Sequence, residues 1–155
     1  MAARLEYMKL APEGMARMTA LGRYLNTETW LETNLLDLVR LLASLMNGCE
    51  YCINLHSTEL RKLHEPEERI AGMMDWKGSS AYTLRERAAF AWTEAVTNIL
   101  EGHAPDAVYD EVRAHFSEVE TVNLTLAITN INTWNRLAIA LGNYPGHAGA
   151  AGVAS

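Results

Sequence analysis

The chain has 155 residues and a formal net charge of −6, with 49% hydrophobic and 21% charged residues. This length and composition predict one soluble globular domain with a substantial core. The acidic balance, without a Lys/Arg cluster, excludes a nucleic-acid partner bound through its phosphates. No apolar run approaches the roughly 20 residues that a membrane span requires. The N-terminal stretch MAARLEYMKLAPEG carries charges where a signal peptide needs its apolar segment, so we expect a cytoplasmic location.

Apolar residues at helical spacing predict helices through the first half of the chain. Residues 12–25 place methionine and leucine on one stripe. Residues 31–48 repeat the spacing and end at an Asn-Gly pair, and glycine just past the last turn is a common helix stop. A new helix is expected to begin at the cysteine motif and to end near Leu63. Pro66 suits the first turn of a short helix that follows.

Two capping boxes predict where the long helices of the second half begin. Thr83 with Glu86, and again Ser117 with Glu120, have the spacing at which each side chain binds the backbone of the other.

The ends of these helices complete the predicted fold. We expect the first of them to end at Gly102, a helix over residues 105–116 to follow, and the last to run to Gly142. That gives an all-α, single-domain helical bundle of about seven or eight helices over residues 1–146. The small, Gly-rich residues 147–155 are expected to form a flexible tail.

The stretch NGCEYCINLH holds both cysteines of the chain, with Cys49, Cys52 and His56 spaced as Cys-x-x-Cys-x-x-x-His. Three kinds of site use such a group: a redox dithiol beside a base, part of a metal site, or a plain disulfide. In a reducing compartment a close cysteine pair is more often catalytic or metal-binding than structural.

On a helix that begins at Cys49, Cys52 lies one turn further on and His56 follows on the same face. The positive end of the helix favours thiolate at its first turn, and His56 can take the proton of Cys52 directly or through water. One sulfur could then reduce a peroxide and become a sulfenic acid, with which the other condenses to a disulfide. The dipole favours Cys49 as the attacking thiol. We prefer Cys52, because a base within reach also helps to protonate the leaving group.

Asp37, on the preceding helix, is the candidate acid behind this base. Two antiparallel helices joined at the Asn-Gly pair would bring its carboxylate near His56, where it would fix the tautomer and raise the basicity of the imidazole. By sequence alone, an aspartate is more often a solvated or capping carboxylate.

The segment DLVRLLASLMNGCEYCINLHSTELRKL resembles the core of the alkylhydroperoxidase AhpD-like, or carboxymuconolactone decarboxylase-like, superfamily. The likeness extends through RERAAFAWTEAVT, PDAVYDEVRAHFSE and LTLAITNINTWNRLA, and covers the chain from about Leu5 to Gly146. The resemblance implies an all-helical homo-oligomer that reduces peroxides through a thiol relay and is recharged by an external dithiol. It implies Cys52 as the attacking thiol, Cys49 as its disulfide partner and His56 as the relay base.

Three positions depart from the pattern of the superfamily. Asp37 stands at the position of the relay glutamate and is one methylene shorter. Its carboxylate could contact the thiol–imidazole pair directly, or it could need a bridging water to reach that pair. Leu42 stands where many relatives have arginine, which removes a charge near the site, and Leu45 stands where glutamine is common. These three changes leave the residues of the thiol chemistry in place. They do not predict the rate of the reaction or the identity of the electron donor.

Three alternatives stand beside the peroxidase interpretation. A zinc site would use Cys49, Cys52 and His56 with His64 or His103 as the fourth ligand, although neither spacing requires it. Acid/base decarboxylation or isomerisation of a lactone acid belongs to a branch of the superfamily that does not depend on a dithiol. A non-enzymatic helical scaffold with incidental thiols is the third. We predict a thiol-dependent peroxidase that acts on organic peroxides and needs no metal, flavin or haem.

The remaining aromatic and acidic residues receive ordinary roles. Trp92, Trp134 and Phe90 are interpreted as core or subunit-contact aromatics. Glu86 and Glu94 are interpreted as solvated or capping carboxylates, with Glu94 also a candidate for a pocket wall.

Overall fold

The computed structural model describes residues 4–142, and the expected tail over residues 147–155 lies outside them. Within that range the protein is a single all-helical domain, as predicted, with eight α-helices, one 3-10 helix and no strand. The elements are α1 (Tyr7–Leu10), α2 (Pro12–Thr27), α3 (Thr33–Asn47), α4 (Glu50–Lys62), α5 (Glu67–Ala71), η1 (Met73–Gly78), α6 (Leu84–Thr97), α7 (Asp106–His115) and α8 (Glu118–Leu141).

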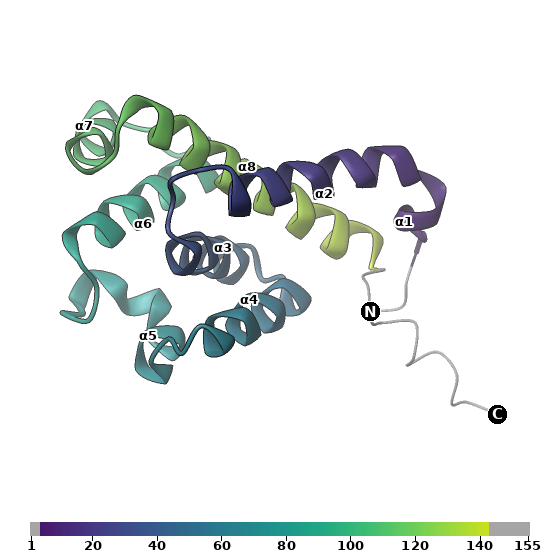
Figure 1. The fold of residues 1–155 in the computed structure, drawn as a ribbon, viewed down its shortest axis with the longest axis horizontal. Coiled ribbons are helices and arrows are strands. Elements are labelled where there is room, and N and C mark those ends of the chain that lie inside the picture. Colours follow the sequence, from purple (N-terminus) through teal and green to yellow (C-terminus); the bar gives the residue numbers. More distant parts are fainter. Residues whose placement is uncertain (1–3, 143–155) are drawn as a thin grey trace.

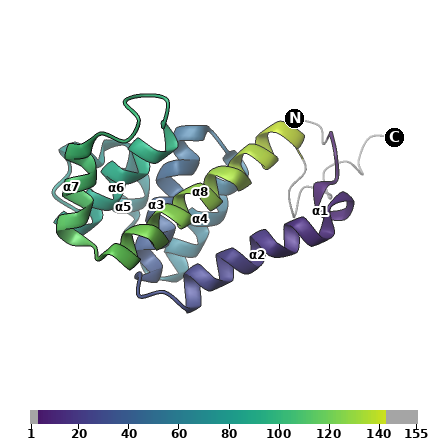
Figure 2. The ribbon, with the colours of Figure 1, turned by 90° about the horizontal axis from the view of Figure 1, so that it is seen from above.

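The central element of the bundle is α3, and its sequence explains that position. Every residue from 35 to 44 is buried, and a helix that is buried on all sides belongs in a core. The helices α4, α6 and α8 pack against it, as Figure 1 shows. In Figure 2 α2 lies along α8 at the edge of the bundle, with α1 and α7 at opposite ends of the molecule. The chain from α2 to α4 therefore passes from the edge through the core.

The predicted helix boundaries are confirmed where a local signal sets them. Both capping boxes are formed, at Thr83 and at Ser117, and each N-cap side chain accepts a hydrogen bond from the glutamate N–H three residues later. The prediction that α6 ends at Gly102 is wrong, because α6 ends at Thr97. Its last two residues, Val96 and Thr97, are β-branched and its C-cap is Asn98, and all three are weak helix formers. His103 follows in a loop with a φ of 52°, which no α-helix contains.

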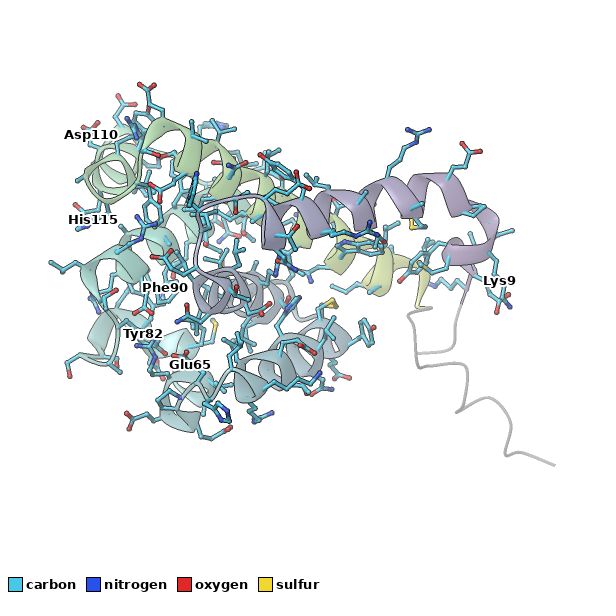
Figure 3. The ribbon with its side chains drawn as sticks, in the orientation of Figure 1. Lys9, Glu65, Tyr82, Phe90, Asp110 and His115 are labelled. Atoms are coloured by element: carbon cyan, nitrogen blue, oxygen red, sulfur yellow. A yellow bond between two sulfur atoms is a disulfide. The ribbon has the colours of Figure 1, made fainter. Side chains whose placement is uncertain are left out.

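An aromatic cluster confirms that Phe90 belongs to the core. Phe90 is fully buried, and Trp76 and Tyr82 contact it edge to face, with ring centroids 5.7 and 5.2 Å away. Figure 3 labels Phe90 and Tyr82 among the side chains between α6 and α5. Trp92 is also buried, and its Nε1 donates a hydrogen bond to Thr125 of α8. These contacts fix α6 against the rest of the bundle.

The two glutamates of α6 have structural partners. Glu86 completes the capping box with Thr83, as predicted, and its buried carboxylate also pairs with Arg69. Glu94 accepts hydrogen bonds from Trp76 and from Lys77. The carboxylate of Glu94 thus joins α6 to η1.

Candidate active site

The candidate site begins at the sharp joint between α3 and α4. Gly48 ends α3 in the left-handed conformation, with a φ of 69°, and the N–H groups of Gly48 and Cys49 donate to the carbonyls of Leu45 and Ser44. A β-carbon at Gly48 would meet no atom within 4 Å, so the positive φ alone favours glycine there. Cys49 then becomes the N-cap of α4. The joint thus folds α4 back along α3 and sets both cysteines at the first turn of α4.

The two cysteines form a buried disulfide with different surroundings for each sulfur. Cys49 and Cys52 are joined, with their Cα atoms 5.3 Å apart, and the residues are 2% and 3% exposed. Cys52 lines a cavity of about 510 Å³, whereas Cys49 is not among the lining residues. A molecule in the cavity therefore meets Cys52 first.

His56 and Asp37 are in direct contact, so the shorter carboxylate does not need a bridging water to reach the imidazole. Nδ1 of His56 lies 3.1 Å from Oδ1 of Asp37, and both side chains are buried. An ionised carboxylate can only accept a hydrogen bond, so Nδ1 carries the hydrogen of the neutral ring and Nε2 is the basic nitrogen. His56 also lines the cavity, on the same face of α4 as Cys52. The structure thus brings together Asp37, Cys52 and His56, with Cys49 adjacent.

Arg40 is a charged residue of the site that our sequence interpretation missed. Its guanidinium donates to the same Oδ1 of Asp37 at 3.2 Å and to the amide oxygen of Asn26 on α2 at 2.8 Å. Arg40 is 7% exposed and lines the cavity. Its position three residues after Asp37 on a helix was a signal for this ion pair. Although Leu42 is a buried apolar residue, Arg40 supplies a cation beside the carboxylate.

A network of amide side chains fixes the end of α3 against α8. Nδ2 of Asn47 donates to the side-chain oxygens of Asn132 and Asn135, at 2.9 Å each. Asn135 is fully buried and donates in turn to the hydroxyl of Ser44 at 3.1 Å. Satisfied buried networks of this kind hold a single packing arrangement, because any displacement leaves polar groups unpaired. The network therefore holds the joint that carries the cysteines.

Two tyrosines and a tryptophan give the cavity a polar and aromatic edge. Burial raises the pKa of Tyr7 and of Tyr51 above the ordinary 10.0, and for Tyr7 the nearby Tyr51 adds to the increase. Both phenols are therefore neutral hydrogen-bond donors at neutral pH. Trp134, which we interpreted as a core or subunit-contact aromatic, is only partly buried and lines the cavity. It packs beside the disulfide together with Tyr51.

The zinc alternative receives no ligand set from the structure. Among residues 4–142 no group of three or more His, Cys, Asp or Glu side chains is arranged to hold a metal ion. His64 and His103, the proposed fourth ligands, lie outside the helices with positive φ angles. In the same range, no helix has the length and apolar character needed to cross a membrane.

Comparisons with known proteins show which family and which solved structures this chain is similar to. The sequence profile of the carboxymuconolactone decarboxylase family matches residues 12–95, which include Asp37, both cysteines and His56. The uncharacterized protein YdfG of Bacillus subtilis (strain 168) is 37% identical over 143 residues, which cover 92% of this chain and 97% of that protein. A crystal structure from Agrobacterium tumefaciens, of a protein of unknown function with a suggested role as an antioxidant defence protein AhpD, is 40% identical. It superposes with a TM-score of 0.87 over 92% of this chain and 97% of that one.

A more distant structure shares the fold alone. The debrominase Bmp8 superposes with a TM-score of 0.79 at 22% identity, over 93% of this chain and 77% of that one.

Proposed function

The chain belongs to the carboxymuconolactone decarboxylase family, and we propose that it acts there as a thiol-dependent peroxidase of the AhpD type. One observation carries the proposal: Cys52 and His56 share the wall of one cavity, and Cys49 lies one turn away from Cys52. A substrate in the cavity meets one thiol and one base, and the second thiol is in place to complete the reaction.

The first step is reduction of the peroxide by Cys52. His56 takes the thiol proton at Nε2, while Asp37 holds the ring through Nδ1 and stabilises the imidazolium that forms. The thiolate attacks the terminal oxygen of the hydroperoxide, the O–O bond breaks, and the sulfur is oxidised to a sulfenic acid. The leaving alkoxide takes the proton back from the imidazolium and departs as an alcohol.

The second step is closure of the disulfide by Cys49. Its position at the N-cap of α4 places its sulfur at the positive end of the helix, which favours the thiolate. This thiolate attacks the Cys52 sulfur, the S–O bond breaks, and the hydroxide leaves as water with the proton that the Cys49 thiol gave up. An external dithiol then reduces the disulfide by two thiol exchanges and is itself oxidised to a disulfide. We place the cycle in the cytoplasm, where such donors are kept reduced.

Peroxide consumption with an excess of a dithiol tests this proposal in the wild type, in Cys52→Ser and in Cys49→Ser. We expect Cys52→Ser to abolish turnover. Cys49→Ser, reduced and then freed of the dithiol, should consume one equivalent of peroxide and leave a sulfenic acid on Cys52, which mass analysis detects after trapping. Free thiols on both cysteines after peroxide treatment, with peroxide consumption unchanged, would contradict the relay.

The same variants distinguish the other candidate activities. Stoichiometric zinc in protein purified without added metal would support the metal site. Decarboxylation or isomerisation of a lactone acid that survives in both Cys→Ser variants would support acid/base chemistry.

We also propose that the protein is a homo-oligomer. Several large apolar side chains of the described surface are exposed, among them Trp30 at 89%, Leu100 at 86%, Val119 at 65% and Val122 at 61%. The last two lie one turn apart on α8, and large exposed apolar patches mark interaction surfaces. Sedimentation should detect an assembly at micromolar concentration, and a stable monomer there would contradict the proposal.

A further inference from the structure

The cavity beside Cys52 is much larger than the smallest peroxide requires. Its volume is about 510 Å³. Hydrogen peroxide needs roughly the space of two water molecules, about 60 Å³ if each water has a share of about 30 Å³. Pockets of about 300–1,000 Å³ are typical of sites that bind organic molecules. The volume therefore fits a peroxide with a sizeable organic part.

The walls of the cavity are apolar and come from separate helices. Met18 of α2, Leu55 of α4 and Ile131 and Trp134 of α8 all line it. They enclose the space beside Cys52 with side chains that gain free energy when hydrocarbon displaces water. A hydrocarbon body would fill this part of the cavity.

Within the part of the chain that the structure describes, the ionic groups that line the cavity are all bases. Arg23 of α2, Arg40 of α3 and His56 of α4 are among the lining residues, and no aspartate or glutamate of this range is. This is unusual for a chain with a formal charge of −6. Asp37 lies behind the wall, in contact with Arg40 and His56.

The two arginines differ in whether their charge is already compensated. The Arg40 guanidinium pairs with Asp37 at 3.2 Å and donates to Asn26 at 2.8 Å. The Arg23 guanidinium has no ion pair or hydrogen bond with any residue from 4 to 142. Arg23 is exposed and so lies where the cavity opens to solvent. It is the cation of the cavity that is left to bind a ligand.

On the basis of the peroxidase function proposed above, we infer that the preferred substrate is an organic hydroperoxide that carries a carboxylate. Arg23 is a positioning residue that binds the carboxylate at the mouth of the cavity, since guanidinium and carboxylate form paired, charge-assisted hydrogen bonds. The hydrocarbon lies against the apolar walls, and the hydroperoxide reaches Cys52 and His56. Arg23 does not touch the reacting atoms, so it acts on binding rather than on the chemical step.

The test compares three peroxides: linoleic acid hydroperoxide, its methyl ester and hydrogen peroxide. Oxidation of the pre-reduced protein in a single turnover gives the half-saturating concentration and the limiting rate without involving the dithiol donor. For Arg23→Gln we expect about a tenfold higher half-saturating concentration with the acid, as for loss of a partly exposed charged hydrogen bond. The limiting rate should not change, and the ester and hydrogen peroxide should be unaffected.

Two further variants separate a specific contact from a general effect of charge. Arg17→Gln removes the same charge from the same helix at a side chain that is 82% exposed and does not line the cavity, so it should behave as wild type. Arg23→Lys keeps the charge and should recover part of the preference for the acid. Equal use of the acid and the ester by the wild type would overturn the inference. So would an Arg23→Gln variant that is impaired equally with all three peroxides.

Binding of ligands that cannot react keeps this inference separate from the proposed function. Calorimetry with decanoate and decanol compares an anionic and a neutral head group on the same chain. We expect tighter binding of decanoate to the wild type and loss of that difference in Arg23→Gln. If no peroxide is turned over but this pattern is found, the peroxidase proposal fails and the preference for a carboxylate stands. If decanoate binds no better than decanol, the preference fails whatever the peroxidase assay gives.

Discussion

Replacing Asp37 by asparagine separates two roles of this carboxylate. It accepts hydrogen bonds from Arg40 at 3.2 Å and from His56 at 3.1 Å, and it is 6% exposed. Asparagine keeps the size of the side chain and removes the charge. The Arg40 guanidinium then remains buried with one amide partner, Asn26, and the imidazole loses its anionic acceptor. The first loss affects stability and the second affects the thiol chemistry.

The expected loss of stability follows from the burial of the pair. Two unit charges 3.2 Å apart attract by about 5 kcal/mol at an effective dielectric constant of about 20. Removing one partner of a buried pair costs about 3–5 kcal/mol, because the remaining charge is left uncompensated. Arg40 also lines the cavity, where water can solvate it, so we expect about 3 kcal/mol for Asp37→Asn. For a chain of this length that lowers the Tm by about 6–12 °C.

A second substitution, Arg40→Met, removes the charge that Asp37→Asn leaves unpaired. The double variant should regain most of the lost free energy of unfolding, because apolar replacement of a buried ion pair is often neutral or stabilising. Its thiol reactivity should not recover, because His56 still lacks the carboxylate. General-base assistance contributes about 10²–10⁴-fold, so loss of the orienting partner should lower the rate of thiol oxidation by about tenfold or more.

Denaturant unfolding of the oxidised proteins and single-turnover oxidation of the reduced proteins measure the two effects. Asp37→Glu is the matched control, because it keeps the charge and restores the residue type of the superfamily; it should keep or raise the rate. The reasoning is refuted if Asp37→Asn has the wild-type free energy of unfolding. It is also refuted if the double variant regains rate together with stability.

Three further predictions concern the surroundings of the site. Gly48→Ala should lower the free energy of unfolding by about 1–2 kcal/mol in a denaturant titration, since only the left-handed φ of 69° opposes a side chain there; no change would mean that the turn relaxes. Asn135→Ala should cost about 1–3 kcal/mol in the same assay, because its buried partners lose their hydrogen bonds; an unchanged midpoint would show that the network is not stabilising. The raised pKa of Tyr7 and Tyr51 should make stability fall as the pH rises above about 10, because the unfolded chain releases these protons first. Tyr7→Phe should weaken this alkaline loss, and an identical pH profile would contradict the assignment.

The parts of the structure that the sequence predicts depend on residues close together in the chain. The Gly48 turn and both capping boxes each need only a few consecutive residues. The contact between Asp37 and His56 spans 19 positions, yet it was predictable because a single sharp turn joins the two helices that carry them. Local chemistry was therefore sufficient for the thiols, the base and its carboxylate.

The parts that the sequence does not predict depend on how distant helices meet. The spacing of three residues from Asp37 could have predicted the ion pair of Arg40. Its hydrogen bond to Asn26 could not be predicted, because Asn26 lies on α2 and the contact depends on how that helix is placed. Asn47 and Asn135 are 88 positions apart and no motif links them. Trp134 lines the cavity, and an aromatic residue on an amphipathic helix has the same pattern whether it faces a core or a pocket.

The charges of the site also bear on position 42, where the resemblance to the superfamily implies an arginine and this chain has leucine. The carboxylate of Asp37 and the guanidinium of Arg40 form an ion pair, so this pair adds no net charge beside His56. When His56 takes the proton of Cys52, one cation and one thiolate form together, so this proton transfer adds no net charge either. A second buried arginine in place of Leu42 would add an uncompensated charge inside the hydrophobic core, which is costly. A carboxylate on the substrate brings one negative charge, and Arg23 at the mouth of the cavity, which has no ion pair with any residue from 4 to 142, can compensate it.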